Sequence, residues 1–185
     1  MNTYEFKLKF GLPASENDMD DLVARLGEAG CDDALIGIGQ PGRIALDFAR
    51  EADSALDAIS SAFADIKQVV PDAKLIEATP DLVGLTDLAD IVGCSRQNIR
   101  KIMVASDGTF PLPVHEGKSA LWHLSNVLIW LNERKSYQVA DDLLDVASIN
   151  MQLNLAKELA AIDQTQRIEI MSLVKKQGQT TFVLL

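Results

Sequence analysis

The segment from Leu85 to Ile102 constrains the fold of this chain most strongly, because its pattern predicts two short helices joined by a tight turn. Apolar side chains recur in it at spacings of three and four, as on one face of an amphipathic helix. They are Leu88, Ala89 and Val92 before the turn at Gly93, and Ile99 and Ile102 after it. Thr86 and Ser95 are expected to cap the two helices, because a hydroxyl there can accept hydrogen bonds from unpaired backbone N–H groups.

The outward positions of the second helix are polar or basic: Arg96, Gln97, Asn98, Arg100 and Lys101. Glutamine and asparagine match the edge of adenine and arginine matches guanine, each bidentate contact discriminating by about 1–3 kcal/mol. The second helix of such a pair enters the major groove of DNA. An ordinary solvated helix face has the same composition. We predict DNA contact by these five residues and by Ser95 at the start of the helix.

A stiff linker and a short hairpin pattern follow the helix pair. Phe110 to Pro113 should be extended, because proline fixes its own φ and restricts the residue before it. Two short β-like runs around Gly117 then predict a small hairpin over residues 114–123. His115 and Lys118 flank its tip and are predicted to touch phosphate or the minor groove. Ser125 is expected to cap a closing helix over residues 126–135.

This order of parts resembles the DNA-binding domain of the AlpA, excisionase and MerR superfamily. The layout from Phe110 to Leu131 is most similar to the AlpA-type branch. The resemblance covers roughly residues 82–135. It implies a winged helix-turn-helix domain, double-stranded DNA as partner, and regulation of phage, mobile-element or defence genes.

The residues before this module predict an acidic ferredoxin-like domain over residues 1–79. Alternating and helical spacings place its elements in the order β-α-β-β-α-β, the split βαβ arrangement. The strands are expected over 3–12, 34–38, 43–50 and 74–78, and the helices over 18–29 and from Asp53 or Ser54 to about Val69. Pro71 is expected to break the second helix, and Thr79 to Asp81 is the expected domain boundary.

The residues after the closing helix predict a helical tail over 136–185. Apolar side chains recur there every three or four residues: Val139, Leu143, Ala147, Met151, Leu155, Leu159 and Ile162. We expect this tail to pair two chains as a homodimer and to end in a strand over residues 180–185. The predicted fold class is therefore α+β, with a ferredoxin-like domain, a winged helix-turn-helix domain and an oligomerisation tail.

Charge is distributed unevenly along the chain. The formal net charge is −10, and residues 1–80 hold 7 basic and 15 acidic side chains. Residues 95–135 hold 6 basic and 3 acidic side chains, so the predicted DNA-contacting part is locally positive. The acidic first domain should weaken non-specific DNA binding and is a candidate surface for a protein partner.

Little in the sequence indicates catalysis, a cofactor or a metal. Cys31 and Cys94 lie in different predicted domains, and both histidines lie in the hairpin region. Asp18, Asp20 and Asp21 lie at a predicted helix start, where they complement the helix dipole. No Ser/His/Asp pattern, zinc spacing or glycine-rich phosphate loop is present. We therefore expect no enzyme activity, and we expect Trp122 and Trp130 to belong to the core.

The sequence favours a dimeric, sequence-specific transcriptional repressor of bacterial or phage origin. Its apolar runs are too short to span a bilayer and its start is not signal-like, so we expect a cytoplasmic protein. An alternative is an antitoxin or adaptor whose acidic domain binds a basic protein while the winged module autoregulates its operon. A third possibility is a protein-docking platform without DNA, which the locally basic helix disfavours.

Overall fold

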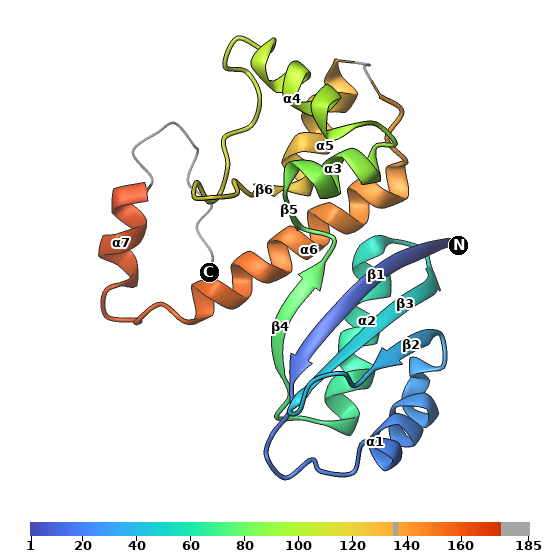
Figure 1. Cartoon of the computed structure of the whole chain (residues 1–185). Helices are drawn as coiled ribbons and strands as arrows, with labels where there is room; N and C mark the ends of the chain where they lie inside the picture. Colours follow the sequence, from blue (N-terminus) through green and yellow to red (C-terminus); the bar gives the residue numbers. More distant parts are fainter. Residues whose placement is uncertain (135–136, 175–185) are drawn as a thin grey trace. The chain divides into compact units, whose positions relative to one another are not determined.

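The computed structural model describes residues 1–134 and 137–174 and has a mixed α+β fold (Figure 1). The chain divides into two compact units after Asn154. The first part of the chain forms β1 (Asn2–Gly11), α1 (Met19–Leu26), β2 (Ala34–Gly37), β3 (Arg43–Ala52), α2 (Ala55–Val69) and β4 (Lys74–Thr79). This order of elements agrees with the alternating and helical spacings of the sequence.

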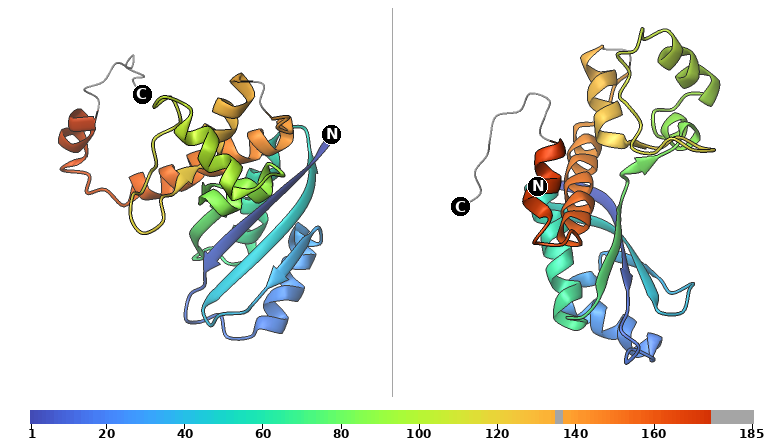
Figure 2. Two further views of the ribbon diagram at one scale, coloured as in Figure 1. Left: turned by 45° about the horizontal axis from the view of Figure 1, so that its top comes forward. Right: turned by 90° about the vertical axis from the view of Figure 1, so that its left-hand side faces the viewer.

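The four strands form one antiparallel sheet in the order β2-β3-β1-β4. β1 pairs with β3 along its whole length, from Asn2 opposite Ala52 to Gly11 opposite Arg43. Helices α1 and α2 cover one face of the sheet (Figure 2). The two-residue period of a strand then sends alternate side chains of the central strands toward these helices.

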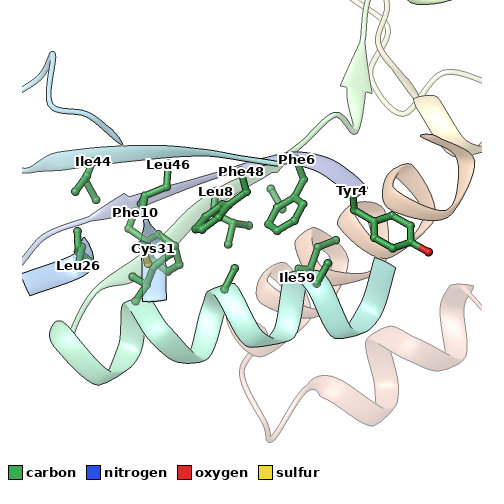
Figure 3. Close-up of a cluster of buried hydrophobic side chains, with 14 of the residues drawn as sticks. Tyr4, Phe6, Leu8, Phe10, Leu26, Cys31, Ile44, Leu46, Phe48 and Ile59 are labelled. Carbon is green, nitrogen blue, oxygen red and sulfur yellow. The ribbon is translucent and has the colours of Figure 1, made fainter. Parts of the chain in front are cut away.

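The core of this part lies between the sheet and α2, as Figure 3 shows. Phe6 of β1 and Phe48 of β3 stack with their ring centroids 5.1 Å apart. Burial of each large apolar side chain contributes about 1.5–3 kcal/mol, so this cluster is the main stabilising term of the domain. The other labelled side chains of the cluster are Tyr4, Leu8, Phe10, Leu26, Cys31, Ile44, Leu46 and Ile59.

The expected helix starts in this part are confirmed. The side chain of Asp18 accepts a hydrogen bond from the Asp21 N–H at 3.0 Å, and Ser54 accepts one from the Asp57 N–H at 3.1 Å. The end of the first helix differs from the prediction. The α-helix stops at Leu26 and continues as a π-helical turn through Cys31, with Gly30 at a φ of 110°.

The following residues form β5 (Leu82–Val83), α3 (Leu85–Ile91), α4 (Arg96–Val104), β6 (Trp122–His123) and α5 (Leu124–Glu133). The predicted hairpin is much smaller than expected. Its arms meet in a single bridge between His115 and Leu121. β6 pairs instead with β5, which precedes the helix pair. Trp122 explains the difference, because its buried ring holds this strand against the core rather than in a free hairpin.

The expected caps of this part are only partly confirmed. The Ser95 hydroxyl accepts a hydrogen bond from the Asn98 N–H at 3.2 Å, as predicted. Thr86 does not cap the first helix, because α3 begins at Leu85 with Gly84 as its cap residue, and the Asp87 carboxylate accepts from the Gly84 N–H. Ser125 does not cap the closing helix either. It lies inside the first turn of α5, fully buried, with its hydroxyl 3.2 Å from the Met151 sulfur.

The two remaining helices are α6 (Asp141–Ala160) and α7 (Arg167–Val174). The part of α6 before Leu155 packs on both hydrophobic cores and so belongs with the preceding residues, where the sequence suggested a separate tail. The predicted terminal strand over residues 180–185 lies outside the described residues. None of the described helices is long and apolar enough to cross a bilayer.

Candidate nucleic-acid interface

Helices α3 and α4 are held by a compact aromatic core. Phe110 meets the ring of Trp122 edge-on at 6.0 Å and that of Trp130 at 5.1 Å. The Trp122 indole N–H donates to the Pro111 carbonyl at 3.0 Å. Both tryptophans are less than one-tenth exposed, so the prediction that they belong to the core is confirmed. The rings fix the chain that leaves α4 against α5.

The turn between α3 and α4 determines how α4 is presented. Gly93 has a φ of 69°, a conformation that glycine adopts without steric cost. The Cys94 N–H donates to the Ala89 carbonyl at 2.9 Å, which closes the turn. Ile99 is 1% exposed and anchors the inner face of α4 against the core. The opposite face of α4 therefore points outward.

That outward face carries the side chains that the sequence predicts for DNA contact. Five of them are exposed, together with the capping serine: Ser95, Arg96, Gln97, Asn98, Arg100 and Lys101. Among the described residues, Arg96, Arg100 and Lys101 have no ion-pair partner. Three unpaired cations on nine helical residues form a local positive surface that can bind phosphate oxygens.

One residue of this face has a partner that sequence reasoning missed. The Asn98 side-chain N–H donates to the Tyr137 hydroxyl at 2.6 Å, across 39 positions of the sequence. The pKa of Tyr137 is raised, first of all by a hydrogen bond with Cys94 in the turn before α4. No local pattern in the sequence signals a contact over this separation.

His115 and Lys118 are exposed on the loop between α4 and β6. No hydrogen bond within the described part of the chain joins them to α4. A Cβ on Gly117 would lie 2.7 Å from the His115 Nε2 atom, so the loop folds tightly around its glycine. The loop therefore exposes His115 and Lys118 without a described hydrogen bond to α4.

His123 lies at the base of the module rather than on its surface. Its Nδ1 atom is 2.6 Å from the carboxylate of Asp81, which is 1% exposed. The second carboxylate oxygen of Asp81 accepts from the Asn154 side chain at 2.7 Å. Over residues 1–134 and 137–174, no three His, Cys, Asp or Glu side chains gather in a way that could hold a metal ion.

Comparison of the chain with models of protein families, with curated proteins and with solved structures found no match. What the geometry offers is a helix pair with a buried inner face, a short turn and an exposed polar and basic outer face. Such a surface can bind phosphate and the edges of bases.

Proposed function

We propose that this protein is a sequence-specific DNA-binding transcriptional regulator, with residues 82–135 acting as a winged helix-turn-helix domain. The observation that carries the proposal is the outer face of α4, where Arg96, Arg100 and Lys101 are exposed and have no ion-pair partner among the described residues. Cations left unpaired on a short, well-anchored helix suit contact with a polyanion. The resemblance to AlpA-type proteins points to the same function by analogy.

In this proposal α4 enters the major groove with its first turn toward the bases. Residues near the start of such a helix contact base edges. Gln97 and Asn98 suit adenine, and Arg96 and Arg100 suit guanine. Lys101, farther along the helix, and Lys118 on the loop suit phosphates, which position the protein without recognising sequence.

The first 79 residues fit a ferredoxin-like fold, which we propose for them. The support is the strand order β2-β3-β1-β4 together with the element order β-α-β-β-α-β. Their 15 acidic side chains within the first 80 residues repel DNA, so this domain is assigned to regulation or partner binding rather than DNA contact.

We propose that the protein binds DNA as a homodimer through its C-terminal helices. α7 has no buried residue, and Ile168, Leu173 and Val174 are 85%, 73% and 75% exposed. A helix that is apolar on several sides and exposed in the monomer is suited to burial against a second copy. A dimer would recognise two half-sites about 34 Å apart, or a multiple of this distance.

The test is selection of bound duplexes from a random DNA library, followed by affinity measurement on the enriched site at two salt concentrations. The full chain should enrich a palindromic motif, with affinity falling steeply as salt rises. Arg96→Ala/Arg100→Ala should abolish enrichment and leave the fold intact. The matched control is Arg43→Ala/Lys74→Ala, which removes two exposed cations from the sheet domain and should keep the motif. Unchanged enrichment by the first variant would refute the role of α4.

Lys118→Ala separates positioning from recognition. If Lys118 contacts a phosphate, its loss should weaken binding to all sequences about equally and lower the salt slope by about one. A change in the enriched motif instead would place Lys118 at a base edge.

The acidic surface supports a second candidate function, an antitoxin or adaptor that binds a basic protein and represses its own operon. Asp20, Asp21 and Glu28 are exposed on α1 and the turn that follows it. Co-purification of the full chain with a small basic protein, lost at high salt, would favour this function. Enrichment of a DNA motif without such a partner would favour the regulator alone.

A further inference from the structure

Two hydrogen bonds hold Asn98 in the first turn of α4. Asn98 is the third residue of the helix, and its side-chain N–H donates to the Tyr137 hydroxyl at 2.6 Å. The neighbouring Cys94 raises the pKa of Tyr137. The Cys94 thiol in turn lies 3.6 Å from the Ser95 carbonyl, to which it donates. Asn98 and Tyr137 are therefore joined beside the helix start, next to the bonded Cys94 thiol.

The direction of these bonds fixes the orientation of the Asn98 carboxamide. A tyrosine hydroxyl has one hydrogen to donate, and an oxygen that can accept. In the structure the Tyr137 oxygen is the acceptor, so it faces the N–H₂ side of the carboxamide and not the carbonyl side. The backbone N–H of Asn98 is held separately by the Ser95 hydroxyl. Both the backbone and the side chain of Asn98 are thus fixed before any ligand arrives.

The groups that remain on Asn98 match the edge of adenine. One amide hydrogen is used by Tyr137, which leaves the second hydrogen and the carbonyl oxygen. Adenine in the major groove offers N7 as acceptor and the N6 amino group as donor. The remaining hydrogen can donate to N7 while the carbonyl accepts from N6. If the carboxamide were reversed, its N–H₂ group would face the N6 amino group of adenine, which is also a donor.

We propose that Tyr137 is a positioning residue for DNA recognition, which holds the Asn98 carboxamide in the orientation that selects adenine over the other bases. This inference rests on the proposed function of α4 as the recognition helix. It adds a residue from outside the helix pair and outside the hairpin loop to the determinants of specificity. Preorganisation of this kind lowers the cost of ordering a side chain on binding.

The experiment compares wild type, Tyr137→Phe, Asn98→Ala and the double variant by selection and by affinity for every single-base change in the enriched site. Asn98→Ala should remove the preference for adenine at one base pair, where a bidentate contact discriminates by about 5- to 150-fold. Tyr137→Phe removes only the hydroxyl and should lower the preference at that same base pair by about 2- to 10-fold. All other positions and the salt slope should stay unchanged.

Two further measurements distinguish positioning from a general structural effect. In the Asn98→Ala background, Tyr137→Phe should have no additional effect at that base pair, because the two residues act through one contact. In the free protein, the side-chain amide resonances of Asn98 should shift in Tyr137→Phe. Tyr4→Phe is the matched control, since it removes the other tyrosine hydroxyl of the chain from the distant sheet core.

The outcomes separate this inference from the proposed function. If wild type enriches a motif and Tyr137→Phe enriches the same motif with equal preference at every position, the inference fails and the regulator stands. If Tyr137→Phe weakens binding equally at all positions, Tyr137 has only a structural role and the inference also fails. If wild type enriches no motif, both fail.

Discussion

Arg50 allows the sharpest test of how the sheet domain is stabilised. Its guanidinium is 9% exposed and donates to both oxygens of Asp33 at 2.7 and 2.9 Å, and to Asp65 at 2.7 Å. It also donates to the Ser61 hydroxyl at 3.1 Å and to the Gly30 carbonyl at 2.6 Å. Burial alone would lower the pKa of Arg50, but the hydrogen bonds and charges of the two carboxylates outweigh it and raise the pKa. The cation therefore stays charged at every practical pH.

Arg50→Met keeps an unbranched apolar stem and removes the charge and the hydrogen-bond donors. Removing one partner of a buried ion pair costs about 3–5 kcal/mol, because the other partner is left without compensation. The carboxylates of Asp33 and Asp65 are 29% and 25% exposed, so water recovers part of that cost. We expect a loss of about 3 kcal/mol in the free energy of unfolding, a large share of the ~5–15 kcal/mol of a typical domain.

Native-state hydrogen exchange on the amides of β1 and β3 is the suitable assay. Trp122 and Trp130 lie in the other core, so their fluorescence follows that core and serves as an internal reference. Arg43→Met is the matched control, because it changes the same residue type in the same strand at an exposed position. A loss below about 1 kcal/mol in Arg50→Met would refute the reasoning. A second check is the double variant Arg50→Met/Asp65→Asn, which should be more stable than the sum of the single losses predicts.

Three further predictions concern the same unit of the chain. Gly30→Ala should cost about 1–3 kcal/mol in urea unfolding, since φ is 110° there and the new Cβ would lie 3.1 Å from the Asp65 carboxylate; an unchanged midpoint would contradict this. Burial raises the pKa of the Cys31 thiol to about 11, so native protein at pH 8 should resist alkylation at Cys31. The free energy of unfolding should fall as pH rises from about 9 to about 11, because the thiol of the unfolded chain loses its proton first. Asn154→Ala should cost about 2–3 kcal/mol, because it removes two hydrogen bonds to the Ala78 backbone and one to Asp81, and calorimetry would measure the loss.

The sequence predicts the local elements of this chain well, because strong periodicity fixes which face of each element is buried. Alternation in β1 and β3 places Phe6 and Phe48 inward, and the structure buries both. The same alternation places Arg50 inward, two residues after Phe48, but sequence reasoning did not use it. Arg50 is a charged residue at a position where the alternation of β3 predicts an apolar one. A charged side chain buried there needs counter-charges beside it.

Contacts between distant segments are the part that the sequence did not predict. β5 and β6 have two residues each, too few to show any alternation, so their pairing could not be inferred. The bond between Asn98 and Tyr137 joins two polar residues that local patterns describe only as surface. The sequence therefore predicted the exposed face of α4. It did not predict the bond between Asn98 and Tyr137, which we propose orients the Asn98 side chain.

Helix α6 shows how one helix can carry two apolar faces. One series, which includes Leu143 and Ala147, predicted a tail helix that pairs two chains. A second series, Val146, Ile149 and Leu153, has the same spacing of three and four. In the structure Leu143 and Ala147 pack against the core of α3 to α5, and the second series packs against the core of the sheet domain. Two such series indicate a helix that packs between two hydrophobic cores rather than one that lies on the surface.

The residues of the candidate interface depend on α6 for their stability. Asn150 donates to the Pro80 carbonyl at 3.3 Å, and Asn154 bonds to Ala78 and Asp81, so α6 also holds the segment that joins the two cores. The Asp81 carboxylate in turn accepts a hydrogen bond from the His123 ring at the base of the proposed DNA-binding module. A fragment limited to residues 82–135 would lose Asp81 and the whole of α6, including the buried Ala147. Because each loss exposes apolar or polar groups that the full chain buries, we expect this fragment to be less stable than the same residues in the full chain, and binding measurements belong on the full chain.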